Sequence, residues 1–508
     1  MKENKKVSDN TSINNPFAGF KTIEISNKTQ SKSLLDVFRS FYFKYKNILN
    51  NIFCVLLCVQ FADTFLDTTT LPPGYVYMGA FYQIFFAIIT FLFTLTSLLT
   101  IIFTILFEEQ VDKLCKITAV ILIVAAIMYS VTSSSYDTSK VFDFLLCIAA
   151  CLGKSYKKIL KPLLITGTVI MLVALLSSQA GLISDYIYSP GRRSLGIIYC
   201  TDFGAHVFFL VMAYIILRKF IPDNQTIIIA LITFEVCFFI AMAKTASLCI
   251  LVALAGISIE FLFQKYKKKS FFYHFKYIMF LIYPLAYISF CLLTALYSYY
   301  PYIFPNNTFT ARFALTAYAF DEFGLDLFGR YIKQNGNGGS AAADADASSN
   351  AINLLDFEKA GFYRFSYALV IILLIIIACI LFAKKLYLYG VTTSLISLLM
   401  TAAPGIAVKL AHREIKSSNT FSDYFWLDSS FMRIIFCDGI VIFAIVLLLS
   451  LFIQYRAFKS ENYLFMFIMC VIALDCTIEH HLTDISYNFI FMLALTDYFD
   501  TNKHKKHA

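Results

Sequence analysis

Two adjacent arginines, Arg192 and Arg193, follow a Pro190-Gly191 turn at the start of an apolar segment. A guanidinium group donates paired hydrogen bonds to phosphate oxygens and keeps its charge at neutral pH. The turn would let backbone amides bind the same anion. The motif therefore predicts capture of a pyrophosphate. The alternative is a pair of interfacial arginines that contact lipid phosphates.

Two further cations are candidates for the same anion. Lys244 lies in a tight connection between two apolar segments. Arg312 lies in a segment, 310–324, whose helical spacing of apolar residues predicts an amphipathic helix against the membrane domain. We expect Lys244 to be a second anion contact and Arg312 a third phosphate or sugar contact. The alternatives are snorkelling of Lys244 to water and a solvated helix face for Arg312.

Glu479, His480 and His481 occupy a short connection between the last two apolar segments. A histidine with a pKa near neutral can accept a proton from a sugar hydroxyl, and a nearby carboxylate can orient it. We predict these three residues as catalytic, with Asp428 as a rival base. The alternative is a group of polar residues at the membrane interface. A third ligand at a zinc-like spacing is missing from the sequence, so we predict no metal.

Other reaction classes find less support. Asp63 and Asp67 lie four residues apart and could bind a divalent cation, but no supporting motif accompanies them. The sequence contains no phosphate-binding or dinucleotide motif in a suitable context. We therefore expect neither a cofactor nor a soluble nucleotide-fuelled reaction.

The elements that hold these residues must lie in a membrane. Of the 508 residues, 59% are hydrophobic and only 15% are charged. The apolar runs are about 17–25 residues long, which is the length of a bilayer-crossing helix. The net charge of +9 comes largely from lysines in short loops, which is typical of cytoplasmic loops and not of a nucleic-acid-binding surface. We predict an all-α polytopic membrane protein without a nucleic-acid partner.

Hydropathy predicts about 14 transmembrane helices. They lie near residues 48–66, 79–107, 115–132, 139–153, 161–180, 197–217, 225–242, 245–263, 276–297, 365–383, 386–408, 431–453, 462–475 and 484–499. When the N-terminus is placed inside, every strongly basic short loop falls on the cytoplasmic side, as the orientation rule requires.

This orientation defines the expected regions of the chain. Residues 1–44 would be a cytoplasmic N-terminal tail, and residues 45–500 a transmembrane domain. Within that domain, residues 298–364 would form one large extracytoplasmic loop. Residues 501–508 would be a cytoplasmic C-terminal tail, so both termini would be cytoplasmic.

Four parts of the chain resemble the Wzy-type polysaccharide polymerases of the O-antigen polymerase and ligase superfamily. They are Arg193-Ser-Leu-Gly196 with Asp202-Phe-Gly204, Ala243-Lys-Thr-Ala246, Thr310-Ala-Arg312 with Phe323-Gly-Leu-Asp-Leu-Phe-Gly329, and Leu427-Asp-Ser-Ser-Phe431 with Asp438-Gly439. Lys244 stands where that family usually has arginine, and lysine cannot make the bidentate fork.

The resemblance implies a GT-C-like membrane glycosyltransferase in the bacterial cytoplasmic membrane. A sugar hydroxyl of one undecaprenyl-pyrophosphate-linked oligosaccharide would attack the anomeric carbon of the growing chain, and the lipid pyrophosphate would leave. Arg192 or Arg193, Lys244 and Arg312 would stabilise the charge of the leaving group. The resemblance also implies membrane lipid, a flippase and a chain-length regulator as partners.

Three rival functions stay open. A ligase of the same superfamily would transfer the finished glycan to another acceptor, and the sequence does not separate the two activities. A flippase or other transporter of lipid-linked oligosaccharides would place charges midway through its spans and often shows two similar halves, which this sequence does not. A structural membrane subunit would not need a cationic outer cavity.

Overall fold

The computed structural model describes residues 34–71, 80–133, 135, 138–188, 191–267, 270–305, 308–334 and 425–500. The predicted spans 365–383 and 386–408, the second part of the large loop and the C-terminal tail lie outside these residues. The chain divides into a unit that ends at Lys46 and a unit that begins at Asn47, and the following description concerns the second.

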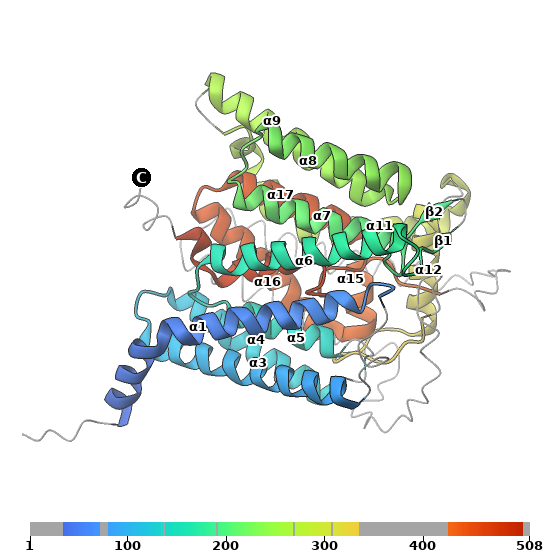
Figure 1. Ribbon diagram of the computed structural model, residues 1–508. Coiled ribbons are helices and arrows are strands. Elements are labelled where there is room, and N and C mark those ends of the chain that lie inside the picture. The colour runs from blue at the N-terminus through green and yellow to red at the C-terminus, as the bar shows by residue number, and fades with distance from the viewer. Residues whose placement is uncertain are drawn as a thin grey trace, which may run out of the picture. The chain divides into compact units, whose positions relative to one another are not determined.

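The described part of the chain is an all-α protein whose helices are suited to a membrane. Eight helices are long and apolar enough to cross a bilayer. They are α1 (Leu34–Leu66), α3 (Ala80–Phe107), α4 (Lys113–Thr132), α6 (Tyr156–Gln179), α7 (Cys200–Leu217), α9 (Lys244–Lys267), α11 (Ile282–Tyr299) and the continuous run of α15 (Ser430–Arg433), η5 (Ile434–Asp438) and α16 (Gly439–Lys459). In Figure 1 the long helices from α3 to α17 lie roughly alongside one another.

Shorter elements complete the described part of the chain. The remaining α-helices are α5 (Thr138–Ala150), α8 (Asn224–Glu235), α10 (Lys276–Phe280), α12 (Thr308–Glu322) and α17 (Tyr463–Ile478). The 3₁₀ and π turns are η1 (Val236–Ile240), η2 (Phe272–Phe275), η3 (Pro301–Ile303), η6 (Phe489–Leu495) and η7 (Asp497–Phe499). The helix predicted in the large loop is confirmed as α12.

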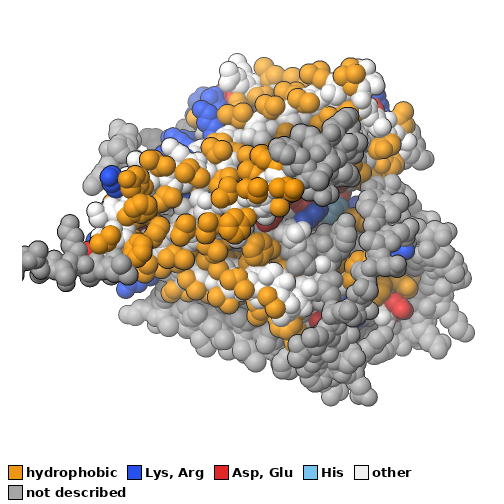
Figure 2. Space-filling view, turned by 60° about the horizontal axis from the view of Figure 1, so that its bottom comes forward, with side chains coloured by type: hydrophobic (Ala, Val, Ile, Leu, Met, Phe, Trp, Pro, Cys, Tyr) orange, Lys and Arg blue, Asp and Glu red, His pale blue; other side chains and the backbone are white. Residues whose placement is uncertain are grey.

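Burial separates a central helix from peripheral ones. Of the most apolar window in Ser430–Lys459, 83% is buried, whereas the corresponding value for Ile84–Phe107 is 22%. The peripheral α3 instead exposes large apolar side chains such as Phe91 and Ile102. Figure 2 shows how widely such side chains cover one face. A surface of this kind is expected against lipid and not against water.

Two of the basic loops, 153–158 and 456–463, meet at one end of the helices through the segment 494–500. Gly153 donates its backbone N–H to the carbonyl of Leu495 at 2.9 Å, and Tyr156 donates its own to Asp497 at 2.9 Å. Arg456 forms an ion pair with Asp500 at 3.0 Å. We call this region, made of 153–158, 456–463 and 494–500, the basic end.

Most of the predicted functional residues lie at a different end. The backbone carbonyl of Thr68, just after α1, accepts a hydrogen bond from the N–H of Ile198 at 2.8 Å. The backbone N–H of Ser430 donates to the carbonyl of Glu479 at 3.1 Å. We call this region, made of 185–199, 425–433 and 479–484, the site end. In Figure 1 the two short strands and α12 mark it, on the side away from the C-terminal label.

The last predicted span, 484–499, differs from expectation because it is not an α-helix. It contains the 3₁₀ turns η6 and η7, and every residue of η6 is buried. Arg456 donates to the carbonyls of Ala494 and Thr496 at 2.8 and 2.9 Å. Irregular backbone at membrane depth requires protein partners of this kind. The segment is apolar because it lies in the protein core.

The predicted span 139–153 is also shorter than expected. The 13 residues of α5 rise about 20 Å, less than the roughly 30 Å of the hydrocarbon core. From Phe144 to Ala150 every residue of α5 is buried. Its Asp143 is buried as well and accepts a hydrogen bond from Gln60 at 3.0 Å. This helix therefore packs inside the protein.

Candidate functional site

The two arginines of the predicted anion motif lie on a short hairpin that separates their side chains. Strands β1 (Ile187–Tyr188) and β2 (Arg192–Arg193) are antiparallel, and Tyr188 pairs with Arg192. Successive side chains of a strand point to opposite faces. Arg193 Nε donates to Asp185 Oδ2 at 2.8 Å, and Asp185 Oδ1 also accepts the backbone N–H of Leu195 at 2.8 Å. Arg193 therefore closes the hairpin.

Arg192 points to the other side of the hairpin, toward the remaining predicted residues. Its guanidinium carbon lies 5.5 Å from the ring centroid of Tyr199. Its Nε is buried and has no hydrogen-bond partner in the described part of the chain. Its charge acts on Asp428. Of the two predicted arginines, the structure thus brings only Arg192 to the site.

Arg312 joins two carboxylates from different segments. Its Nε lies 3.0 Å from Asp428 Oδ2, and its Nη2 lies 3.4 Å from Glu479 Oε1. The side chain of Ser430 holds the backbone near Glu479 in place. Its hydroxyl donates to the Glu479 carbonyl at 2.5 Å and accepts a hydrogen bond from the N–H of Leu482 at 3.2 Å. Arg312 and Ser430 therefore connect three elements, which are α12, the start of α15 and the end of α17.

Burial changes the pKa of both carboxyls beside Arg312. Burial raises the pKa of Glu479 well above its ordinary value, and the guanidinium of Arg312 opposes this rise. Burial also raises the pKa of Asp428, which Arg312, Arg433 and Arg192 oppose. Two carboxyls that share one guanidinium disfavour each other's ionisation. The group can therefore hold a proton near the cations.

The predicted histidines belong to a column of stacked rings. The centroid distances are 4.0 Å for His481 on Tyr487, 4.0 Å for Tyr487 on His206, and 4.4 Å for His480 and His481. In order, the column consists of Phe65, His206, Tyr487, His481, His480 and Trp426. Arg433 covers the far ring, with its guanidinium carbon 5.0 Å from the Trp426 centroid.

The histidines differ electrostatically from the prediction. Burial lowers the pKa of His481 to about 3 and that of His480 well below its ordinary value. Both imidazoles are therefore neutral and weakly basic at neutral pH. These directions differ from the expected pKa near neutral, because the packed rings exclude water from His481 and from much of the half-buried His480.

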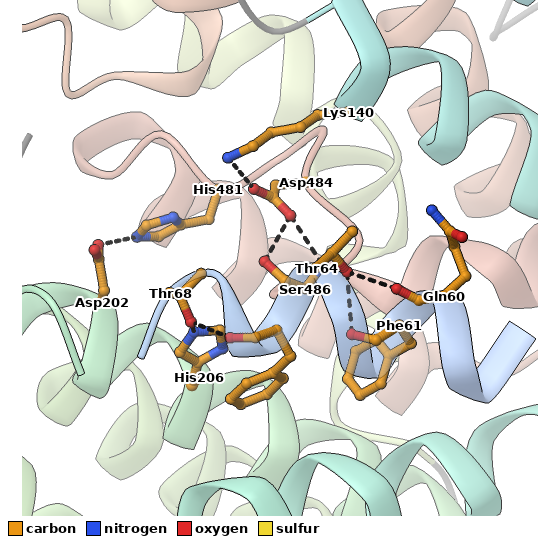
Figure 3. A network of polar contacts seen from close by, with 11 residues as sticks. Gln60, Phe61, Thr64, Thr68, Lys140, Asp202, His206, His481, Asp484 and Ser486 are labelled. Carbon is orange, nitrogen blue, oxygen red and sulfur yellow. Dashed lines mark hydrogen bonds and ion pairs between the residues drawn. The ribbon is translucent and has the colours of Figure 1, made fainter. Parts of the chain in front are cut away.

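Asp202 is a site residue that the sequence analysis did not select. It lies in the first turn of α7, and its Oδ1 is 3.8 Å from Nε2 of His481 (Figure 3). On the other side of His481, Asp484 accepts hydrogen bonds from Lys140 at 2.9 Å and from the Ser486 hydroxyl at 2.6 Å. Only folding shows these neighbours, because 279 positions separate Asp202 from His481.

Lys244 does not join this group. It is exposed at the start of α9 and makes no ion pair or hydrogen bond within the described ranges. Its small neighbours pack against α7 instead, since a Cβ at Gly204 would lie 2.4 Å from Cβ of Ala243. The small-residue motif around Lys244 is therefore a helix-packing motif in this structure.

The site end carries a balanced set of charges. At the site end and directly beside it, the basic side chains are Lys140, Arg192, Arg193, Arg312 and Arg433, and the acidic ones are Asp185, Asp202, Asp428, Glu479 and Asp484. Figure 2 shows basic, acidic and histidine side chains close together in a recess beside the apolar face. Such a cluster can bind an anion once one carboxyl accepts a proton. Comparisons with family models, curated proteins and solved structures found no match for this chain.

Proposed function

We propose that the protein is a polysaccharide polymerase of the bacterial cytoplasmic membrane, with a GT-C-like fold. It joins undecaprenyl-pyrophosphate-linked oligosaccharide units on the outer face of that membrane. The observation that carries this proposal is the position of Arg312 between Asp428 and Glu479, with the charge of Arg192 acting on Asp428. Charged groups from four predicted outer connections converge there.

The arginines suit the leaving group of this reaction. As the bond between the anomeric carbon and the pyrophosphate oxygen breaks, the electron pair stays on the pyrophosphate. Preorganised cations in a dry site stabilise that charge most strongly. Arg192 and Arg312 supply planar donors for phosphate oxygens. Lys244 has no part in this proposal because it lies exposed on α9.

The attacking hydroxyl must lose its proton as its oxygen bonds to the anomeric carbon. Glu479 is the carboxyl best placed for this, since it is buried beside Arg312, where the pyrophosphate would bind. His480 and His481 directly follow it and line the same site. The growing glycan, membrane lipid, a flippase and a chain-length regulator are the partners that this reaction would need.

The test is chain extension by the purified full-length protein in lipid vesicles. The substrate is undecaprenyl-pyrophosphate-linked oligosaccharide extracted from the source cells, and products are separated by length. We expect a ladder of longer glycans, and a loss of about 10²-fold or more in kcat/KM for Arg312→Ala.

Arg330→Ala is the matched control. Arg330 belongs to the same predicted outer loop but is half-exposed and paired with Asp326 at 3.7 Å. We expect its kcat/KM to stay within about threefold of the wild type, since exposed ion pairs contribute little. A single transfer to a different acceptor, without a ladder, would identify a ligase instead. If no glycosidic bond forms with any lipid-linked oligosaccharide, the proposal is wrong.

A further inference from the structure

We infer that Asp202, His480 and His481 form a binding site for a divalent transition-metal ion such as Zn²⁺. One ligand atom from each side chain lies within 4.8 Å of the others. Zinc bonds of about 2.0–2.1 Å in tetrahedral geometry place neighbouring ligand atoms about 3.4 Å apart. Closing the difference requires a shift of less than about 1 Å from each side chain.

The polar atoms of this group lack other partners. Oδ1 of Asp202, Nδ1 of His480 and both ring nitrogens of His481 are buried without a hydrogen bond in the described part of the chain. His481 is fully buried. Native proteins rarely leave such atoms unsatisfied, and a clustered set indicates a shared partner, which is an ion, a ligand or ordered water. A metal ion would satisfy one atom of each side chain at once.

The distance between Asp202 and His481 favours an ion over a direct hydrogen bond. Nε2 of His481 and Oδ1 of Asp202 are 3.8 Å apart, which is too long for a hydrogen bond. Figure 3 shows the carboxylate facing the edge of the imidazole. The gap suits an ion bonded to both atoms, with His480 as the third ligand.

The surroundings hold the ligands in position. Tyr487 stacks on His481 with ring planes 28° apart, and Trp426 meets His480 edge-on at 5.5 Å. These packed rings limit how far either imidazole can turn. The nearby cation Lys140 is paired with Asp484 at 2.9 Å, so its charge is compensated locally.

Two imidazoles and one carboxylate indicate the class of ion. Imidazole suits Zn²⁺ and its transition-metal neighbours, whereas Mg²⁺ and Ca²⁺ prefer oxygen ligands. Three protein ligands leave a fourth position for water or a substrate oxygen. The inference that a metal binds depends only on these three residues. A role in polarising the acceptor hydroxyl beside Glu479 rests in addition on the proposed function.

The test measures metal binding directly. The full-length protein is purified in detergent with an affinity tag that contains no histidine, stripped with a chelator, and titrated with Zn²⁺ and Co²⁺. We expect one ion per chain. Asp202→Asn, His480→Gln and His481→Gln should each weaken binding by at least about tenfold.

Two neighbouring residues provide controls. Asp428→Asn changes an acid that is paired with Arg312, and His206→Gln changes a ring of the same column that is hydrogen-bonded to Thr68 at 2.7 Å. Both variants should bind Zn²⁺ within about threefold of the wild type, because neither residue contributes a ligand atom. Equal affinity in the wild type and the Asp202→Asn, His480→Gln, His481→Gln triple variant would overturn the inference.

Zinc-edge X-ray absorption of the wild type supplies a readout that needs no variant. Scattering from two imidazoles supports the site, and scattering from fewer contradicts it. The two proposals fail separately. Zinc bound by these ligands in a protein that extends no glycan contradicts only the polymerase. Chain extension by a protein that binds no zinc contradicts only the metal site.

Discussion

At the scale of residues, two adjacent arginines make contacts on opposite sides of the hairpin. Sequence reasoning treated Arg192 and Arg193 as one cationic motif. Because they follow each other in a strand, Arg193 reaches Asp185 at the base of the hairpin and Arg192 reaches the ring of Tyr199. Of these two neighbours, only Arg192 is therefore expected to join Arg312 in binding the pyrophosphate.

This division predicts unequal variants. Arg192→Ala should lower kcat/KM for chain extension by at least about tenfold, because a half-buried guanidinium whose Nε lacks a partner in the described part of the chain is lost from the site. Arg193→Ala should change kcat/KM by less than about threefold, since its ion pair is 40% exposed on the arginine side. Extension assays on both variants, together with their melting temperatures, make the comparison. Greater loss of activity in Arg193→Ala than in Arg192→Ala would contradict it.

At the scale of elements, two glycines join the large predicted loop to the central helix. Gly329 and Gly439 have φ angles of 84° and 90°. A Cβ at Gly439 would lie 2.3 Å from the backbone nitrogen of Gly329. The close approach allows two backbone hydrogen bonds. The N–H of Arg330 donates to the carbonyl of Cys437 at 3.0 Å, and the N–H of Ile440 donates to the carbonyl of Asp326 at 2.9 Å. The segment after α12 is thereby attached at the start of α16.

Gly439→Ala should therefore destabilise the fold by about 2–5 kcal/mol, from steric overlap and a positive φ together. Gly181→Ala is the control, because Gly181 also has a positive φ of 72° but nothing lies within 4 Å of its added Cβ. It should cost only about 1–2 kcal/mol. Thermal unfolding in detergent compares the two variants, and equal melting temperatures would show that the glycine contact contributes little.

At the scale of the whole molecule, the proposed function needs the site end to face outward. The basic end carries two of the loops, 153–158 and 456–463, that the orientation rule places in the cytoplasm. A short epitope inserted after Gly181, in an exposed turn near the hairpin, should bind antibody on intact spheroplasts. The same epitope inserted after Glu109, in the exposed turn between α3 and α4, should bind only after permeabilisation. The reverse pattern would contradict both the orientation and the proposed reaction.

The sequence by itself determined that the protein is helical and suited to a membrane. Apolar runs such as those of α3 and α6 are long enough to cross a bilayer, and this property is local to each run. Hydropathy measures how apolar a segment is and does not identify what covers it. For that reason it could not distinguish the buried α5 and the 3₁₀ segment η6 from lipid-facing helices.

Residue types also directed attention to Arg192, Arg312, Glu479 and the two histidines. The tertiary structure alone decided that Asp428 and Glu479 share Arg312, that Arg193 turns away, and that burial weakens the histidines as bases. It also brought Asp202 beside His481. These facts depend on distance and solvent exclusion between segments far apart in the chain, and a single sequence records neither quantity.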